Sequence, residues 1–253
     1  MSLRLDDTGF GGIRILQDPE TFCYGVDAVL LAGFAAETLA KKHRRPARLA
    51  DLGCGNGIVP LILSHKTSIP HLHGIEVQEQ MAALADENVR QNGLEDRLTI
   101  TCGNVRDAEP EGPLMQALGG PGSFDAVTSN PPYMPADRGL TSANEAKAIA
   151  RTELKGDLDD FLKMAGLLLR DKGDLFLIHR PQRLVDILVG CRKHGIEPKT
   201  LVPVSARPGE APNLILVHGI CGGGVELKLE QTFFVRNECG EYSRELLDVY
   251  ERL

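Results

Sequence analysis

No stretch of the sequence approaches the ~18 uninterrupted apolar residues that a membrane-spanning helix needs. The N-terminal segment MSLRLDDTGFGG also contains no apolar core of the kind found in secretory signal peptides. The chain has no C-x-x-C pair, and its cysteines are scattered at Cys23, Cys54, Cys102, Cys191, Cys221 and Cys239. This spacing argues against a zinc site and against a disulfide scaffold. We therefore expect a cytoplasmic protein with reduced thiols, no metal and no membrane partner.

The sequence also lacks internal repeats, low-complexity linkers and an overall excess of positive charge. A net charge of −7 argues against nucleic-acid binding over the whole surface. The charge is nevertheless uneven, because five Lys or Arg residues lie between Lys41 and Arg48, and residues 180–210 carry a local excess of basic residues. Basic segments of this kind are typical of solvated faces or of a polyanion-binding patch, and both interpretations stay open.

Strand-like and helix-like segments alternate from residue 47 onwards. Short apolar runs that predict strands lie at residues 47–53, 71–77, 97–103, 124–130 and 174–179, and segments with helical spacing lie between most of them. This alternation predicts an α/β fold with a doubly wound, mostly parallel sheet covered on both faces. Residues 199–206 and 212–220 predict an antiparallel closing pair of strands.

Three helices are predicted in detail, two of them outside this alternation. Residues 27–42 are apolar on nearly all sides, which indicates a buried helix. In residues 157–173, Asp157 is the expected N-cap and Gly173 the expected stop. The last helix should dock on the core through Leu246, Val249, Tyr250 and Leu253. We expect a single domain over residues 1–253, with an N-terminal arm and helix (1–46), a core (47–220) and a C-terminal strand and helix (221–253).

The first predicted strand runs into the glycine-rich loop DLGCGNG. Gly53, Gly55 and Gly57 allow tight turns and a close approach of the backbone to a ligand. The second predicted strand ends in Glu76, whose carboxylate can accept hydrogen bonds from ribose hydroxyls. Loop and acid together predict a nucleoside-containing cofactor. The dinucleotide fingerprint G-x-G-x-x-G/A fails at its third glycine, where the chain has Ile58, and this argues against a dinucleotide-dependent oxidoreductase.

The fourth predicted strand runs into SNPPYM, in which two prolines stiffen the backbone and remove two hydrogen-bond donors. If the strand order is 3-2-1-4-5, the first and fourth strands flank the point where the order reverses, and ligands bind at the carboxyl ends there. We therefore expect this segment and the glycine loop to share one crevice. The Asn130 side-chain carbonyl and the rigidly held Pro131 backbone carbonyl would accept hydrogen bonds from a planar amino group, and Tyr133 would stack on it.

The segments DLGCGNG, GIEV and SNPPYM together resemble the amino-methyltransferases that use an Asn-Pro-Pro-Tyr motif. That group includes adenine-N6 methyltransferases of DNA and RNA and protein glutamine methyltransferases. FGGIRILQDPETFCYGVDAVLLAGF and VRNECGEYSRELLDVYERL are similar to the bacterial valine-tRNA adenine-N6 methyltransferase family, so the resemblance spans essentially the whole chain. It implies a Rossmann-like class I methyltransferase with a seven-stranded sheet, S-adenosyl-L-methionine as cofactor, and the N6 amino group of the adenine 3′ of the anticodon in a valine tRNA as target.

The resemblance also implies roles for individual residues. Glu76 would hold the cofactor ribose, and Asn104 stands where such enzymes usually place an aspartate near the cofactor adenine. The residues implied for cofactor binding are Phe22, Asp27, Asp51, Gly53, Gly55, Gly57, Glu76 and Asn104. The residues implied for catalysis are Asn130, Pro131, Pro132 and Tyr133.

Contact with the tRNA substrate is expected from the long loop after Tyr133, which contains Arg138, Lys147 and Arg151. The target adenine would have to leave its stack to reach Asn130. The sequence leaves the oligomeric state open between a monomer and a weak dimer.

Two other functions stay open at this point. A protein glutamine N-methyltransferase would use the same Asn-Pro-Pro-Tyr site, although such enzymes usually carry a separate N-terminal helical domain and only residues 1–46 precede the core here. A non-catalytic RNA-binding module of the same fold would need neither the intact glycine loop nor Asn130. A DNA methyltransferase is disfavoured, because 253 residues leave no room for a target-recognition domain.

Overall fold

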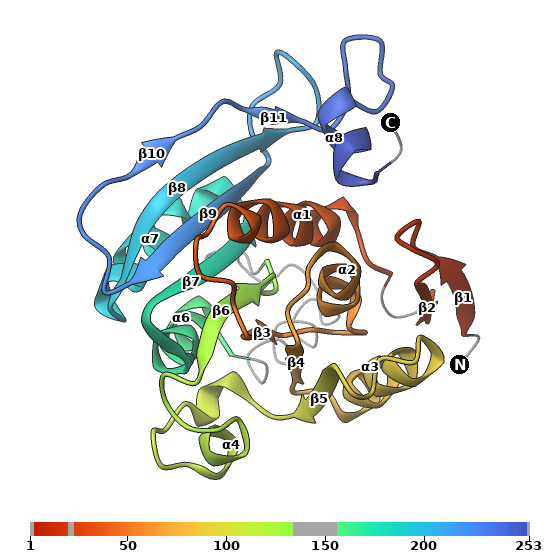
Figure 1. Cartoon of the computed structure of the whole chain (residues 1–253). Coiled ribbons are helices and arrows are strands. Elements are labelled where there is room, and N and C mark those ends of the chain that lie inside the picture. Colours follow the sequence, from red (N-terminus) through yellow and green to blue (C-terminus); the bar gives the residue numbers. More distant parts are fainter. Residues whose placement is uncertain (1–2, 20–22, 134–155, 252–253) are drawn as a thin grey trace, which may run out of the picture.

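A nine-stranded sheet forms the centre of the computed structural model, which describes residues 3–19, 23–133 and 156–251 (Figure 1). Its strands follow the order β10-β8-β9-β7-β6-β3-β4-β5, with β11 also paired to β8. The strands are β3 (Arg48–Leu52), β4 (His71–Glu76), β5 (Leu98–Cys102), β6 (Phe124–Ser129), β7 (Leu169–His179), β8 (Ile196–Ser205), β9 (Leu214–Cys221), β10 (Lys228–Leu229) and β11 (Phe233–Phe234).

The pairing confirms the doubly wound α/β fold that the alternation predicts. The strands β3 to β7 are all parallel and lie in the expected order, with β3 between β4 and β6. Strand β9 runs antiparallel to both β7 and β8, which is the expected closing pair. The two-residue strands β10 and β11 extend the seven expected strands at the β8 edge. Both lie in residues 221–253, where a single C-terminal strand was expected.

Helices cover both faces of the sheet. On one face lie α1 (Val26–Ala40), α2 (Ile58–Lys66) and α3 (Glu79–Gln91). On the other lie α4 (Pro113–Ala117), α6 (Leu158–Leu168) and α7 (Leu184–Lys193), with the short 3₁₀ turns η1 (Val105–Asp107) and η2 (Pro181–Arg183). Figure 1 shows α1 and α7 on opposite sides of the strands they cover.

The apolar strand residues alternate between two cores. In β7, Phe176 and Ile178 pack against the α1 face, and Leu175 and Leu177 against the α6 face. Because successive side chains of a strand point to opposite faces, a strand buried on both sides reads as a continuous apolar run. The continuous apolar runs of these strands therefore result from their burial on both faces.

The boundary between α6 and β7 differs from the prediction. Asp157 caps α6 as expected, and its side chain accepts a hydrogen bond from the Asp160 backbone N–H at 3.0 Å. The helix ends at Leu168, however, and the expected stop Gly173 lies inside β7. Leu169 pairs with Phe124 in the sheet and is buried, so strand pairing takes over from the helix before any glycine signal appears.

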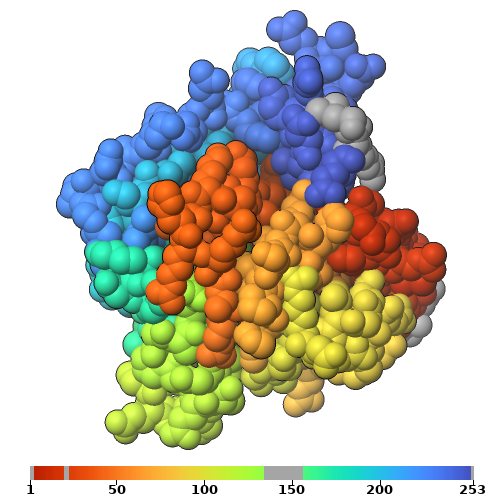
Figure 2. Space-filling view, in the orientation of Figure 1, coloured from red at the N-terminus to blue at the C-terminus, as the bar shows by residue number. Residues whose placement is uncertain are grey.

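The N-terminal arm contains a hairpin that the sequence did not predict. Strands β1 (Arg4–Asp7) and β2 (Arg14–Gln17) pair antiparallel. The hairpin is fixed to α3, because the side-chain oxygens of Asn88 and Asn92 accept hydrogen bonds from the backbone N–H groups of Leu16 (2.6 Å) and Arg14 (2.9 Å). Figure 2 shows this red segment lying against the yellow α3 segment.

The C-terminal helix α8 (Arg244–Val249) docks on the core, as its spacing predicts. Leu246 is fully buried, and Tyr250 stacks on Phe10 with ring centroids 5.5 Å apart. Gly33 of α1 lies so close to α8 that a Cβ there would come within 2.7 Å of Val249. Leu253 lies outside the described residues. The helix thus connects the N-terminal hairpin with α1. The division of the chain into residues 1–46, 47–220 and 221–253 stays a prediction.

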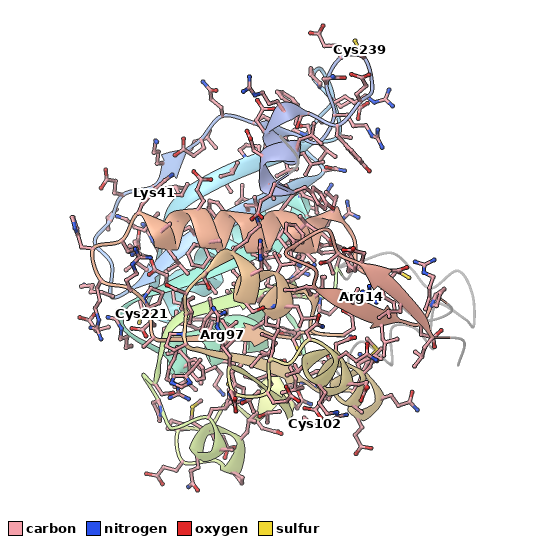
Figure 3. All side chains as sticks on the ribbon, turned by 45° about the vertical axis from the view of Figure 1, so that its right-hand side comes forward. Arg14, Lys41, Arg97, Cys102, Cys221 and Cys239 are labelled. Carbon is pink, nitrogen blue, oxygen red and sulfur yellow. The ribbon has the colours of Figure 1, made fainter. Side chains whose placement is uncertain are left out.

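The cysteines are all free, and Figure 3 shows Cys102, Cys221 and Cys239 in widely separated parts of the molecule. No helix in residues 3–19, 23–133 and 156–251 has the length and apolar character needed to cross a membrane. Within the same residues, no cluster of three or more His, Cys, Asp or Glu side chains is arranged to hold a metal ion.

Docking of α8 predicts that Leu246→Ala destabilises the protein by ~2–5 kcal/mol, because the truncation leaves a cavity against α1. Leu229→Ala is the matched control, since Leu229 is 67% exposed and its loss should cost less than ~0.5 kcal/mol. Urea denaturation measures both values. Equal stability of the two variants would show that α8 does not contribute to the folded core.

Candidate functional site

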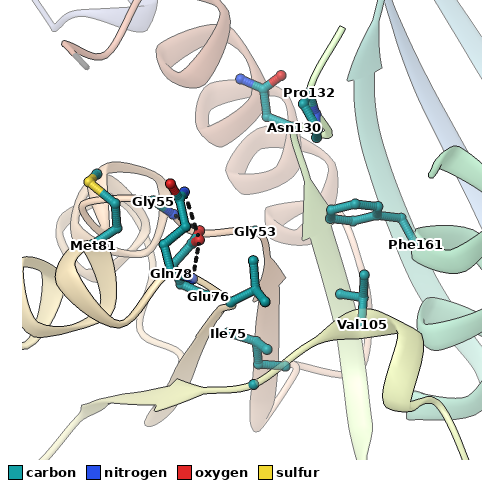
Figure 4. Close-up of a pocket in the computed structure, with 12 residues that line it drawn as sticks. Gly53, Gly55, Ile75, Glu76, Gln78, Met81, Val105, Asn130, Pro132 and Phe161 are labelled. Atoms are coloured by element: carbon teal, nitrogen blue, oxygen red, sulfur yellow. Dashed lines mark hydrogen bonds between the residues drawn. The ribbon is translucent and has the colours of Figure 1, made fainter. Parts of the chain in front are cut away.

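A pocket of about 270 Å³ lies at the carboxyl ends of β3, β4 and β6 (Figure 4). It lies between the glycine loop after β3 and the segment after β6, which the strand order predicts to be neighbours. The lining residues are Gly53, Gly55, Ile75, Glu76, Val77, Gln78, Met81, Gly103, Val105, Asn130, Pro132 and Phe161. The pocket therefore combines a backbone cradle, one carboxylate, two amides and an apolar wall.

The glycine loop needs its glycines for backbone conformation. Gly53, Gly55 and Gly57 have φ values of 71°, 56° and 86°, in the left-handed region that side-chain-bearing residues rarely adopt. At Gly53, a Cβ would also lie 3.1 Å from the Phe161 ring. The backbone N–H of Gly53 donates to the Ile75 carbonyl at 2.8 Å, so the loop folds back over the end of β4.

Glu76 ties this loop to the next strand while lining the pocket. One carboxylate oxygen accepts from the Gly55 backbone N–H at 3.0 Å, and the other accepts from the backbone and side-chain nitrogens of Gln78 at 2.9 and 3.1 Å. A carboxylate offers about four acceptor positions, so these three bonds leave room for a further donor. Figure 4 shows the carboxylate between Gly55 and Gln78 at the wall of the pocket.

Asp51 lies beneath the loop rather than in the pocket lining. It is 2% exposed, and one of its carboxylate oxygens accepts a hydrogen bond from the Thr128 hydroxyl on β6 at 2.7 Å. Burial, opposed by this hydrogen bond and reinforced by the nearby charge of Glu76, raises the pKa of Asp51 to about 7. Asp51 thus joins the two central strands directly below the pocket.

The Asn-Pro-Pro-Tyr segment meets the first turn of α1. Asn130 and Pro132 line the pocket, whereas Pro131 is buried. One carboxylate oxygen of Asp27 accepts a hydrogen bond from the Asn130 amide nitrogen at 3.1 Å and another from the Tyr133 hydroxyl at 2.9 Å. Asp27 itself is not among the lining residues.

Tyr133 is held on three sides. Its ring meets His179 edge to face, with centroids 5.2 Å apart, and the Arg180 guanidinium covers one ring face at 4.9 Å. Burial first, and then the carboxylate of Asp27, raise the pKa of Tyr133, so its hydroxyl stays protonated and able to donate. Burial and neighbouring arginines lower the pKa of His179 to about 4, so this ring is neutral near pH 7.

Not all predicted site residues lie at the pocket. Asn104 lies between the lining residues Gly103 and Val105 but is not in the lining, and its side-chain oxygen accepts from the Arg106 backbone N–H at 3.0 Å. Four predicted residues lie outside the described part of the chain, namely Phe22, Arg138, Lys147 and Arg151.

Sequence reasoning missed several lining residues. Gln78 lies two residues after Glu76, where β4 ends, and this closeness to a strand end was the available signal. Phe161 was expected only as part of the apolar face of its helix, because a residue that closes a pocket and a core residue have the same helical spacing. The contact between Asp27 and Tyr133 joins residues 106 positions apart, and no local pattern indicates it.

The basic segment from Lys41 to Arg48 leads into β3, at the end of the strands opposite the pocket. Lys42 forms an ion pair with the buried Asp174 at 2.6 Å, and the Arg48 guanidinium donates to the carbonyls of Leu118 (3.0 Å) and Ser123 (3.3 Å). These bonds hold the segment at that end of the strands, away from the pocket.

The chain resembles known methyltransferases over most of its length. The family model described as "Methyltransferase small domain" matches residues 12–187, which is more than half of the chain. A tRNA1(Val) (adenine(37)-N6)-methyltransferase of Porphyromonas gingivalis is 29% identical over 192 residues, covering 76% of this chain and 72% of the relative. A protein of the same name from Aeromonas salmonicida is 26% identical over 222 residues, covering 87% of this chain and 84% of the relative.

Solved structures show the same fold. A predicted O-methyltransferase from Agrobacterium tumefaciens superposes with a TM-score of 0.70 at 22% identity, covering 89% of this chain and 96% of that chain. The M. jannaschii TYW2 structure in complex with AdoMet has a TM-score of 0.57 at 13% identity, covering 87% and 85% of the two chains. At these identities the likeness concerns the fold alone.

The raised pKa of Asp51 predicts a pH-dependent stability. Between pH ~4 and ~7 the folded protein keeps a proton that the unfolded chain has released, so stability falls as pH rises, by at most ~1.4 kcal/mol per pH unit. Asp51→Asn cannot titrate. Its stability relative to the parent should therefore improve by ~2 kcal/mol between pH 5 and pH 8 in urea denaturation without added ligand.

The control for this measurement is Asp86→Asn on the exposed side of α3, whose stability relative to the parent should hardly change over the same pH range. If the Asp51→Asn difference is the same at pH 5 and pH 8, Asp51 does not hold a proton in the folded protein.

Proposed function

Because the chain belongs to the methyltransferase small domain family, we propose that it transfers a methyl group from S-adenosyl-L-methionine to the N6 amino group of adenine in tRNA. One observation carries the proposal: Asn130 and Pro132 line the same pocket as the glycine loop and Glu76. An acceptor for an amino group and a cradle for a nucleoside cofactor thus share one space. The proposed target is the adenine at position 37 of a valine tRNA, as in the names of the relatives.

The pocket fits a cofactor that contains a nucleoside. Gly53 and Gly55 offer backbone without side chains, and the open acceptor position on Glu76 suits a ribose hydroxyl. The carboxylate oxygen that accepts from the Gln78 side chain also accepts from the Gln78 backbone, so each oxygen of Glu76 has room for two donors. The apolar residues Ile75, Val105 and Phe161 suit a planar base. When bound, the cofactor would supply an electrophilic methyl group on a sulfonium.

The residues after β6 are suited to orient an amino nitrogen. The lone pair of an exocyclic amino group is delocalised into its ring, so acceptors on its N–H groups help to localise it and to fix the direction of attack. Asn130 offers a side-chain carbonyl, and Pro131 a backbone carbonyl between two rigid positions. Holding the reacting atoms in a near-attack geometry can contribute several kcal/mol to the rate.

At most one face of the Tyr133 ring is free for a base to stack on, whereas the sequence alone suggested an open ring. The guanidinium of Arg180 covers one face of the ring, so an incoming base has the other face available or must displace Arg180. Stacking of a base on an aromatic ring contributes ~1–3 kcal/mol. Arg180 is exposed, and its charge lies where a nucleotide phosphate would accompany the base.

The proton released by the methylated amino group does not require a strong base in the pocket, because the product ammonium is acidic. The raised pKa of Tyr133 and the lowered pKa of His179 agree with this: the phenol stays protonated and the imidazole is a weak base. A glutamine amide would use the same two acceptors. Among the described residues, no feature of the pocket favours protein methylation, so it is treated as an alternative outcome of the experiment below.

Asn130→Ala should lower the rate of methyl transfer by about 100-fold or more, because it removes an acceptor that acts on the reacting nitrogen. Cofactor affinity should change by less than ~3-fold, since the glycine loop and Glu76 remain. The measurement is transfer of labelled methyl groups to unmodified valine tRNA transcripts, followed by nucleoside digestion. Calorimetric titration gives the cofactor affinity.

The matched control is Gln91→Ala, which truncates an exposed amide at the end of α3 and should leave the rate unchanged. If the parent protein methylates a glutamine-containing peptide but no tRNA, the proposed tRNA substrate is wrong and the protein is a protein methyltransferase. Full activity of Asn130→Ala on tRNA would contradict the assigned role of this residue.

A further inference from the structure

We propose that Asp27 is a positioning residue that sets which end of the Asn130 amide faces the pocket and holds Tyr133 beside it. The inference rests on the proposed methyl transfer, because it concerns the acceptor used in that reaction. It gives Asp27 a different role from the cofactor contact that the sequence resemblance implies.

The bonding pattern of Asp27 is the basis of the inference. Its Oδ2 accepts from both the Asn130 amide nitrogen (3.1 Å) and the Tyr133 hydroxyl (2.9 Å). Its Oδ1 accepts from the Ala28 backbone N–H at 3.0 Å in the first turn of α1. One oxygen thus anchors the carboxylate to the helix, and the other gathers the two polar side chains of the Asn-Pro-Pro-Tyr segment.

The chemistry of the two groups makes this contact selective. An asparagine amide has a donor end and an acceptor end of nearly the same shape, whereas a carboxylate can only accept. Asp27 therefore accepts the nitrogen end of Asn130 and repels the oxygen end. With the nitrogen directed to Asp27, the oxygen is left to accept a hydrogen bond from an amino group in the pocket. Figure 4 shows the Asn130 amide at the end of the pocket with its nitrogen and oxygen pointing apart.

The local backbone makes room for this carboxylate. A Cβ at position 25 would lie 2.7 Å from the Asp27 Oδ1, so only glycine leaves the observed position free. The φ of Gly25 is −108°, which any residue can adopt, so space and not conformation accounts for this glycine. A carboxylate in the first turn of a helix is also favoured by the positive end of the helix dipole. Gly25 and α1 are therefore both suited to hold Asp27.

Tyr133 is clamped by the same arrangement. Asp27 accepts from its hydroxyl, Arg180 covers one ring face and His179 packs against its edge. Burial keeps the pKa of Tyr133 high, so the hydroxyl remains a donor across the neutral range. A free tyrosine at this position would lose side-chain entropy on binding a base, whereas this ring is already ordered.

The test is Asp27→Asn, assayed for methyl transfer to tRNA. An amide can present either end to Asn130, so the orientation of Asn130 is no longer selected. We expect kcat to fall by about 10- to 100-fold, while the KM for tRNA and the Kd of the cofactor each change by less than ~3-fold. Asp27→Glu keeps a group that only accepts, and it should recover part of the lost kcat. A residue that merely stabilises the fold would not produce this split between kcat and binding.

Melting curves identify a variant that fails to fold. Asp27→Ser, which is also compatible with the first turn of a helix, carries the same comparison if Asp27→Asn is unfolded. Unchanged kcat in a folded variant that lacks the carboxylate overturns the proposal. Loss of cofactor affinity in proportion to the lost activity overturns it as well, because Asp27 would then act on the cofactor.

Asn130→Ala separates this inference from the proposed function. If Asn130→Ala is inactive and Asp27→Asn is fully active, the positioning role is wrong and the proposed function stands. If Asn130→Ala is fully active, the acceptor role itself is wrong, and the role of Asp27 is wrong with it.

Discussion

The parallel pairing of β3 with β6 is the constraint on which the rest of the site depends. Leu52 lies opposite Ser129 in the register, so the residues that follow, Gly53 and Asn130, emerge side by side at the same edge. The Ser129 hydroxyl donates to the Leu52 carbonyl at 3.0 Å and fixes the strand ends at this point. Because helices cover both faces of the sheet, ligands can enter only at its ends. A shift of one residue would turn Asn130 away from the glycine loop.

This pairing also explains why different strand ends form different sides of the pocket. The loop after β3 and Glu76 at the end of β4 form the proposed cofactor side of the pocket, and the segment after β6 carries the proposed acceptors for the amino group. Helix α1 packs on one face of the sheet and contributes Asp27, which accepts a hydrogen bond from Asn130 after β6. The basic segment from Lys41 to Arg48 lies at the other end of the strands, so its charge stabilises the fold rather than the site.

Most of the sheet could be predicted from the sequence, because strands buried on both faces have continuous apolar runs and turn signals separate them from the helices. The glycine loop and the Asn-Pro-Pro-Tyr segment were also readable, since both have conformational needs that few residues meet. The N-terminal hairpin was not, because it depends on Asn88 of the distant helix α3 and on Asn92, the residue that follows this helix. Gly173 failed as a helix stop because pairing of Leu169 with Phe124 decides that boundary. The role of Asp27 depends on a contact across 103 residues, which periodicity does not report.

The central claim is that the shared pocket methylates adenine N6 in one tRNA. The most direct measurement is nucleoside mass spectrometry of individually purified tRNAs from the organism that carries this gene, with the gene intact and deleted. The account predicts that N6-methyladenosine disappears from a valine tRNA and returns when the gene is restored. An unchanged modification pattern in every tRNA of the deletion strain would contradict it.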